Sequence, residues 1–202
     1  MTLAVSLLAC YLIGSIPFSF IFSKLRRGVD PRQAGTGNVG ASNTLLVAGK
    51  LAGLLAVVGD TAKGVGAIML ARHLGLNDWG LALSALAVVL GHDFSLFLGF
   101  KGGKGVATTG GVLIALDPFF VVIIILLWVL SMLMLQRFIP GTLLTFISIP
   151  LVMWLGSWHF AFILWGAVNA LLALYAHRLD LERFLAGHEL TIQESLAKTF
   201  KK

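Results

Sequence analysis

Residues 119–136 read FFVVIIILLWVLSMLMLQ and carry no charged side chain. A helix of about 20 apolar residues crosses the hydrocarbon core of a bilayer, and roughly 17 to 25 are tolerated. This stretch is therefore predicted to span a membrane. The whole chain fits that prediction, because its 202 residues are 58% hydrophobic and only 12% charged. So few charges do not cover the surface of a soluble domain of this size.

Six further apolar stretches flank this one, which predicts an all-α integral membrane protein with seven transmembrane helices in a single domain, 1–202. The fourth stretch is too short to cross the full hydrocarbon core alone. Asp117 and Pro118 end it, and proline disfavours helical geometry in the preceding residue, so a turn is expected there. The predicted spans are 2–23, 51–71, 79–99, 106–117, 119–136, 141–157 and 160–176.

The basic residues predict the orientation of these spans. No Lys or Arg precedes Lys24, so the first span does not resemble a signal peptide, which begins with positive charge. With seven spans and the N-terminus outside, all of the 15 Lys and Arg residues except Lys63 and Arg72 fall on one side. Positive loops mark the cytoplasmic side, so the C-terminus is predicted to be cytoplasmic. The net charge of +6 is scattered over segment ends, which disfavours a nucleic-acid surface.

Three polar segments interrupt the apolar chain on that same side. They are 35–43 (GTGNVGASN), 101–105 (KGGKG), and His177-Arg178 with Asp180. Successive unhindered backbone N–H groups form a concavity that binds anions, and a nearby ammonium group neutralises the charge. The segments therefore indicate phosphate chemistry at a membrane surface.

Segment 35–43 combines flexible backbone with hydrogen-bonding side chains. Glycine allows a positive φ and close approach of a ligand, while hydroxyl and amide groups supply hydrogen bonds. A flexible, turn-rich loop without a ligand is the competing interpretation. The candidate binding residues are Thr36, Gly37, Asn38, Gly40, Ser42 and Asn43.

Segment 101–105 is similar to a nucleotide-binding P-loop only superficially. That pattern requires Ser or Thr after its Gly-Lys pair, and here Lys104 is followed by Gly105. A backbone nest with two lysines for a smaller phosphate is expected instead. Lys101, Gly102, Gly103 and Gly105 are the candidate binding residues, and Lys104 is a candidate catalytic residue.

Ionisable residues inside the spans are costly and mark functional or structural sites. Asp60 and Lys63 are three residues apart on one predicted helix, a spacing that allows an ion pair. We expect them to stabilise helix packing around the site, and His92 to shape the loop after its span. His177 and Asp180 are candidate catalytic residues that orient a hydroxyl or accept its proton. The chain offers no cluster of metal ligands, so neither a metal nor a cofactor is expected.

The motifs together resemble those of the bacterial acyl-phosphate:glycerol-3-phosphate acyltransferase family (PlsY), over nearly the whole chain and in the same order. The resemblance rests on Gly14-Ser15-Ile16-Pro17, Gly35-x-Gly37-Asn38-x-Gly40-Ala41-x-Asn43, Gly49-Lys50, Asp60-x-x-Lys63-Gly64, Gly91-His92, Phe100-x-Gly102-Gly103-Lys104-Gly105-Val106-Ala107-Thr108, and His177 with Arg183.

This resemblance implies transfer of a fatty acyl group from acyl phosphate to glycerol 3-phosphate, giving lysophosphatidic acid for phospholipid synthesis. It implies a multi-pass protein of the bacterial inner membrane with a cytoplasmic active site and no covalent enzyme nucleophile. By the same resemblance, 35–43 would hold the acyl-phosphate head group, and Thr36 and Lys104 would clamp the acceptor phosphate. Thr142, His177 and Asp180 would surround the acceptor hydroxyls. No obligate protein partner is evident.

Four positions depart from the family pattern. Leu46 stands where an arginine is usual, and that arginine is associated with the acceptor phosphate. Asp180 replaces a usual asparagine, Ser95 a proline, and Ala176 an arginine. The acceptor side of the predicted site therefore has less positive charge than the family pattern.

Two alternatives remain open from the sequence. A divergent paralogue would acylate a different acceptor, which the change at Leu46 makes plausible. A transporter or lipid-binding protein would use the same segments for phosphate head groups. Transporters commonly contain inverted repeats and broken helices at the membrane midplane, and no convincing repeat is present here.

Overall fold

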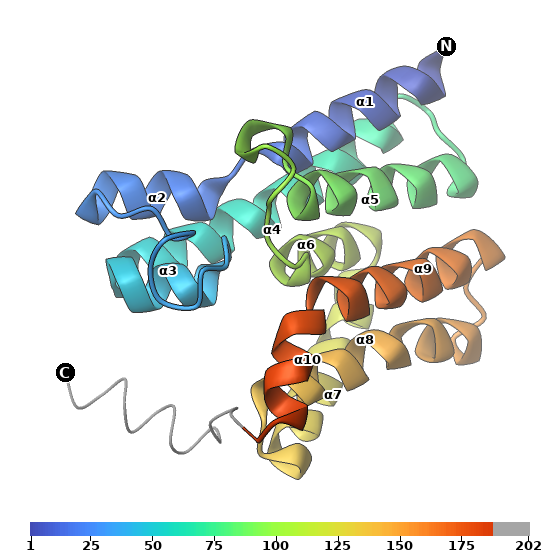
Figure 1. Ribbon diagram of the computed structural model, residues 1–202. Coiled ribbons are helices and arrows are strands. Elements are labelled where there is room, and N and C mark those ends of the chain that lie inside the picture. The colour runs from blue at the N-terminus through green and yellow to red at the C-terminus, as the bar shows by residue number, and fades with distance from the viewer. Residues whose placement is uncertain (188–202) are drawn as a thin grey trace. The chain divides into compact units, whose positions relative to one another are not determined.

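The computed structural model describes residues 1–187, and this part of the chain contains helices and no strand. The chain divides into two compact units after Pro118, and each is described by itself (Figure 1). The prediction of an all-helical protein is confirmed for the described residues. The single domain over 1–202 stays a prediction.

The first unit contains six α-helices and one short 3₁₀ turn. Its helices are α1 (Thr2–Ser15), α2 (Phe18–Arg27), α3 (Ala41–Ala48), α4 (Lys50–His73), α5 (Asp78–Asp93), the turn η1 (Leu96–Leu98) and α6 (Val106–Leu116).

The described part of the second unit, up to residue 187, contains four helices. They are α7 (Pro118–Leu135, whose first residue is the last of the first unit), α8 (Phe138–Leu155), α9 (Phe160–Ala176) and α10 (Arg178–Leu185). Gly166 of α9 lies against Pro150 of α8, where a Cβ would come within 3.3 Å of the proline nitrogen, so these two helices pack closely.

Helix packing in the first unit depends on glycines at the contacts. A Cβ added to Gly14 of α1 would collide with the Val88 carbonyl of α5, and one on Gly91 would collide with the Tyr11 carbonyl. Small residues let backbones approach closely inside a membrane, where dispersion and hydrogen bonds drive helix association. The same close approach joins α4 to α6, through Gly64 and Gly111.

The spans agree with the sequence in position but differ in two details. The predicted first helix, 2–23, is broken between Ser15 and Phe18, because Pro17 lacks the N–H that helix continuation needs. The predicted loop 24–50 contains the helix α3. The predicted turn at Asp117 is confirmed, since this residue has extended backbone (φ −155°, ψ 109°) between α6 and α7.

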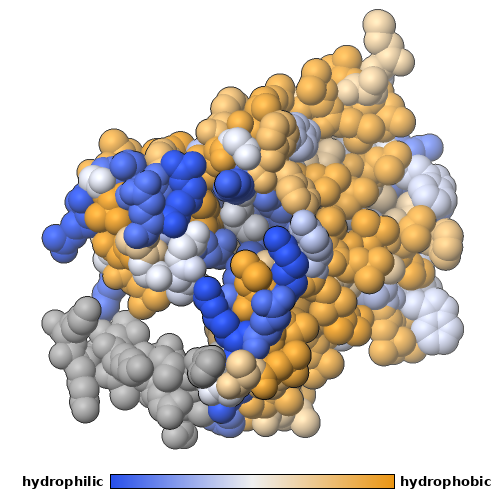
Figure 2. Space-filling view, in the orientation of Figure 1, coloured by the Kyte–Doolittle hydropathy of each residue, from blue (hydrophilic) through white to orange (hydrophobic). Residues whose placement is uncertain are grey.

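Five stretches of the described chain are long and apolar enough to cross a membrane, or six if α9 and α10 count as one bent span. Helix α6 is apolar but shorter. Seven crossings, and the sidedness of the termini, therefore stay predictions. Figure 2 shows the broad hydrophobic surface, with hydrophilic residues gathered over α2 and the loop that follows it.

Candidate functional site: two glycine-rich loops in the first unit

The loop before α3 is organised around the side chain of Asn43. Its Nδ2 donates to the carbonyl oxygens of Pro31, Ala34 and Asn38 at 2.8, 3.0 and 2.9 Å. Its Oδ1 accepts from the backbone N–H of Thr36 at 2.8 Å. Asn43 is only 1% exposed. The Asn43 side chain therefore holds the loop backbone in shape. In this structure its amide group is bonded to the loop itself, so Asn43 positions the neighbouring candidate residues.

The other candidate residues of this loop are accessible. Thr36, Gly37 and Ser42 are exposed, and Asn38 is half-buried. Gly37 has a φ of +75°, as the sequence predicts for a glycine turn. Gly40 differs, because it is extended (φ −136°) and begins α3 as its N-cap. Its carbonyl oxygen accepts from the N–H of Thr44 at 2.9 Å.

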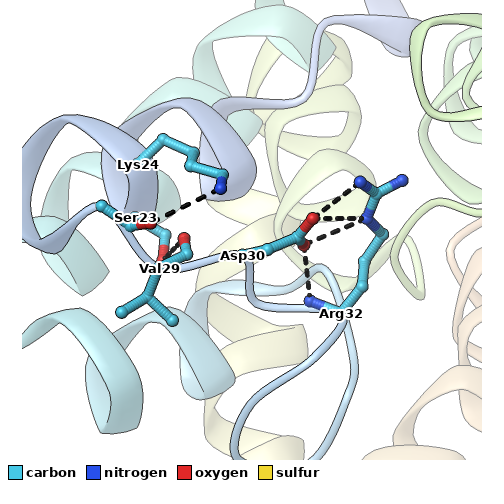
Figure 3. Close-up of polar contacts among 6 residues, drawn as sticks. Ser23, Lys24, Val29, Asp30 and Arg32 are labelled. Carbon is cyan, nitrogen blue, oxygen red and sulfur yellow. Dashed lines mark hydrogen bonds and ion pairs between the residues drawn. The ribbon is translucent and has the colours of Figure 1, made fainter.

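An exposed ion pair lies at the start of this loop (Figure 3). Arg32 Nη2 lies 2.7 Å from Asp30 Oδ2, and Arg32 Nε donates to Asp30 Oδ1 at 3.0 Å. The hydrogen bonds from Arg32 lower the pKa of the Asp30 carboxyl group to about 2. Asp30 therefore stays ionised at neutral pH, and Arg32 has a carboxylate partner within its own loop.

The loop between η1 and α6 is fastened to the end of α5. The N–H of Gly102 donates to the Asp93 carbonyl oxygen, and that of Gly103 to the His92 carbonyl oxygen, both at 3.0 Å. The expected backbone nest is therefore wrong for these two amides, because they are already paired within the protein. Lys101 is exposed and Lys104 is half-buried. Gly105 has a φ of +69° and begins α6, which explains its place in the motif.

The two loops meet each other. A Cβ added to Gly103 would collide with Nε2 of His92 and would lie 2.8 Å from the Val39 carbonyl oxygen. At Gly103 the second loop therefore contacts both the imidazole ring of His92 and the backbone of the first loop. Val39 and Gly103 are 64 residues apart in sequence (103 − 39), and the fold brings them together.

The expected ion pair in the spans is present beneath these loops. Lys63 Nζ lies 2.8 Å from Asp60 Oδ1, and both residues are buried. His92 Nδ1 lies 3.5 Å from the same oxygen.

The remaining candidates belong to the second unit. Helix α9 ends before His177, and the chain bends by 60° into α10. No continuous helix therefore carries His177 and Asp180 on one face, and the predicted end of the span at residue 176 agrees with the end of α9. His177 is 2% exposed, and its Nδ1 lies 2.9 Å from the Ala173 carbonyl oxygen. Asp180 Oδ1 lies 3.9 Å from Nη1 of Arg183.

Thr142 also lies in the second unit, on α8. Its hydroxyl donates to the Phe138 carbonyl oxygen at 2.8 Å and accepts from Nε1 of Trp128 at 3.0 Å. The Thr142 side chain therefore joins α7 to α8, and Thr142 is 1% exposed.

Two of the departures from the family pattern have a visible structural consequence. Ser95 donates from Oγ to the Ser15 carbonyl oxygen at 2.6 Å, a bond that the usual proline has no group to make. Leu46 lies on α3 and is 57% exposed, so a longer side chain at this position can extend into the surroundings.

Sequence reasoning missed the hydroxyl groups that connect the loops to the broken first helix. Thr44 Oγ1 donates to the Ser19 carbonyl oxygen at 3.3 Å, and Tyr11 donates from its hydroxyl to the Phe94 carbonyl oxygen at 2.7 Å. Isolated hydroxyl groups in apolar stretches were the available signal, since a buried hydroxyl needs a partner.

These features are typical of an integral membrane protein in which two glycine-rich loops, the second with two lysines, contact each other. A family model described as glycerol-3-phosphate acyltransferase matches residues 4–187, and the chain belongs to that family. It is 43% identical over 189 residues to the glycerol-3-phosphate acyltransferase of Bordetella pertussis, covering 90% of this chain and 88% of that one. It is 34% identical over 191 residues to the protein of the same name from Desulforamulus reducens, covering 95% and 96%.

A solved structure gives the same assignment. The crystal structure of PlsY, an integral membrane glycerol 3-phosphate acyltransferase in its glycerol 3-phosphate form, superposes with a TM-score of 0.89. The two chains are 34% identical, and the match covers 97% of this chain and 99% of PlsY. The family resemblance inferred from the motifs is confirmed.

Proposed function

We propose that this protein transfers a fatty acyl group from acyl phosphate to the sn-1 hydroxyl of glycerol 3-phosphate, giving lysophosphatidic acid and phosphate. The observation that carries the proposal is the contact between the loops at Val39 and Gly103, in a chain of the glycerol-3-phosphate acyltransferase family. The protein then supplies the entry step of phospholipid synthesis. We place it in the bacterial inner membrane with seven spans, the N-terminus outside and both loops facing the cytoplasm.

The chemistry needs little from the enzyme beyond placement and charge. Acyl phosphate is a mixed anhydride, so its carbonyl carbon is already activated for attack. The acceptor hydroxyl oxygen forms the new ester bond, the carbon–oxygen bond to phosphate breaks, and phosphate leaves with the electron pair. Positioning of two bound reactants and electrostatic stabilisation of the leaving group are large contributions to such reactions. No cofactor takes part in this scheme.

The first unit supplies the phosphate-binding part of the proposal. The loop around Asn43 presents Thr36, Gly37 and Ser42 to the acyl-phosphate head group. Lys104, with Lys101 beside it, neutralises the phosphate charge, and Thr36 also contacts the acceptor phosphate.

In the second unit, His177 and Asp180 are proposed to orient the acceptor hydroxyl and to receive its proton. The carbonyl oxygen of Ala173 only accepts, so the 2.9 Å contact assigns a hydrogen to Nδ1 of His177. Neutral His177 then has its lone pair on Nε2, the form that accepts a proton. Thr142 is proposed to lie with these residues around the acceptor hydroxyls.

The test is product analysis with the purified protein. Labelled acyl phosphate is supplied with glycerol 3-phosphate or with other alcohols, and the products are separated by thin-layer chromatography. Labelled lysophosphatidic acid is expected, with a loss of about 100-fold or more in Lys104→Ala. Arg27→Ala is the matched control, because Arg27 is an exposed basic residue of α2 outside both loops.

Other outcomes decide against the proposal. Acylation of another alcohol but not of glycerol 3-phosphate would identify a divergent acceptor. Uptake of phosphate compounds into proteoliposomes without acyl transfer would identify a transporter.

A further inference from the structure

Three ionisable side chains form a buried cluster between α4 and α5, which we call the tie cluster: Asp60, Lys63 and His92. Asp60 Oδ1 lies 2.8 Å from Lys63 Nζ and 3.5 Å from His92 Nδ1. The three residues are only 2%, 4% and 7% exposed. Charges at such depth are costly and persist only where they are paired and serve a purpose.

One side of the tie cluster holds the break in the first span. The break leaves backbone carbonyl groups without helical partners in an apolar environment, where each needs a donor. Lys63 Nζ donates to the Ile16 carbonyl oxygen at 3.1 Å. Ser19, just after the break, donates from Oγ to Asp60 Oδ2 at 3.4 Å. Asp60 and Lys63 of α4 therefore both bind the chain where it changes direction.

The same connection reaches the first loop. The carbonyl oxygen of Ser19 accepts from Thr44 Oγ1 at 3.3 Å, and Thr44 lies on α3 next to Asn43. Asn43 in turn holds the loop backbone through its four hydrogen bonds. Asp60 is thus linked through Ser19 and Thr44 to the helix that shapes this loop.

The other side of the tie cluster holds the second loop. The His92 carbonyl oxygen accepts from the N–H of Gly103 at 3.0 Å. The imidazole ring lies so close to Gly103 that a Cβ there would collide with Nε2. The next residue along the chain is Lys104, so the position of His92 sets the position of the lysine backbone.

The space between these groups is too small for a substrate. A cavity of about 10 Å³ is lined by residues that include Ile16, Val39, Asp60, Lys63 and Gly103. That volume is at the lower limit for a single water molecule. The tie cluster therefore acts through the residues around it, and no substrate reaches it here.

We infer that Asp60, Lys63 and His92 are positioning residues that fix the separation of the two phosphate-binding loops. Asp60 and Lys63 anchor the broken first span and, through Ser19 and Thr44, the first loop. His92 anchors the second loop and touches the carboxylate of Asp60. The kinetic part of this inference rests on the proposed function, whereas its structural part does not.

The experiment measures the distance between the loops directly. Spin labels at Thr36→Cys and Lys101→Cys, in a Cys10→Ala background, report the loop-to-loop distance distribution by pulsed electron paramagnetic resonance. Asp60→Asn/Lys63→Met removes both charges of the ion pair together, so that neither member is left charged without the other. The inference predicts a broader or shifted distribution. In the unlabelled chain it predicts a fall in kcat of about tenfold or more, because misaligned reactants lose rate.

The matched control is Ser6→Ala/Ser84→Ala. This pair makes a buried 3.0 Å hydrogen bond between α1 and α5 with no connection to either loop. Its variant should keep the distance distribution of the parent. His92→Ala is a second test with both charges retained, and it should broaden the distribution through the second loop alone.

Two results would overturn the inference that the tie cluster positions the loops. A tie-cluster variant that loses thermal stability but keeps the parent distance distribution would show a packing role only and would overturn the inference. Equal broadening in the Ser6/Ser84 control would also overturn it. If the parent protein shows no acyl transfer, the proposed function fails, and the distance measurement still decides whether the cluster positions the loops.

Discussion

At the scale of single residues, Gly103 is the position where the two loops, and the ring beneath them, leave no space. Gly103→Ala should lower acyl transfer by about tenfold or more, since a shift of about 1 Å in a positioning element has large effects on rate. The added Cβ would collide with His92 Nε2 and come within 2.8 Å of the Val39 carbonyl oxygen. Turnover of the purified variant is the measurement.

The control for this change is Gly66→Ala on α4, where an added Cβ meets no atom within 4 Å. It should keep full activity. Equal activity in the Gly103 variant would show that the loops tolerate displacement and would contradict the close fit.

Leu46 stands where the family resemblance predicts an arginine that contacts the acceptor phosphate. Leu46→Arg should lower the KM for glycerol 3-phosphate by about tenfold, because a charged hydrogen bond contributes about 1.5–3 kcal/mol. The position is 57% exposed, so the longer side chain can be accommodated. Saturation kinetics for each substrate measure the effect.

Leu25→Arg serves as the control, because it adds the same charge at a 75% exposed position of α2. An equal decrease in KM in the Leu25→Arg variant would show that any added positive charge attracts the anionic glycerol 3-phosphate. No decrease in the Leu46 variant would contradict a role for this position in binding the acceptor phosphate.

At the scale of elements, two adjacent glycines of α6 have opposite environments. A Cβ on Gly111 would collide with the Thr61 carbonyl oxygen of α4, whereas one on Gly110 meets nothing within 4 Å. Gly111→Ala should therefore destabilise the protein by about 1–3 kcal/mol, the usual cost of overpacking. Gly110→Ala should be neutral or stabilising, since alanine favours helix over glycine.

Thermal unfolding in detergent compares the two variants under identical conditions. A lower midpoint is expected for Gly111→Ala alone. Equal midpoints would show that α4 and α6 separate at little cost, which would remove the support of the loop that precedes α6.

At the scale of the whole molecule, the sequence predicts the helices well and their interruptions poorly. Apolar runs locate α4, α7, α8 and α9 within a few residues, because the bilayer thickness sets their length. The predicted span 79–99 extends beyond the end of α5 at Asp93, and α10 was not predicted. Pro17 is a local signal for the break at Ile16, but the donors that satisfy the freed carbonyl groups, such as Lys63 and Ser95, lie elsewhere in the chain.

The candidate site, too, could be predicted from the sequence only in part. Glycine spacing identifies both loops, and the two lysines mark the second one, because backbone N–H groups and ammonium groups bind anions. Which amides stay available depends on tertiary contacts, so the pairing of Gly102 and Gly103 with the end of α5 was not predictable. The bend at His177 is a further case, since nothing in its local sequence interrupts a helix.

The central claim is that segments 35–43 and 101–105 form one site on the cytoplasmic face of the membrane. Single cysteines at Thr36, Lys101 and His73, in a Cys10→Ala background, are tested with a membrane-impermeant maleimide in vesicles of known orientation. His73 lies at the opposite end of α4 from the loops. The account predicts labelling of Thr36→Cys and Lys101→Cys in inside-out vesicles only, and of His73→Cys in right-side-out vesicles only. Labelling of the two loop positions from opposite faces would contradict it.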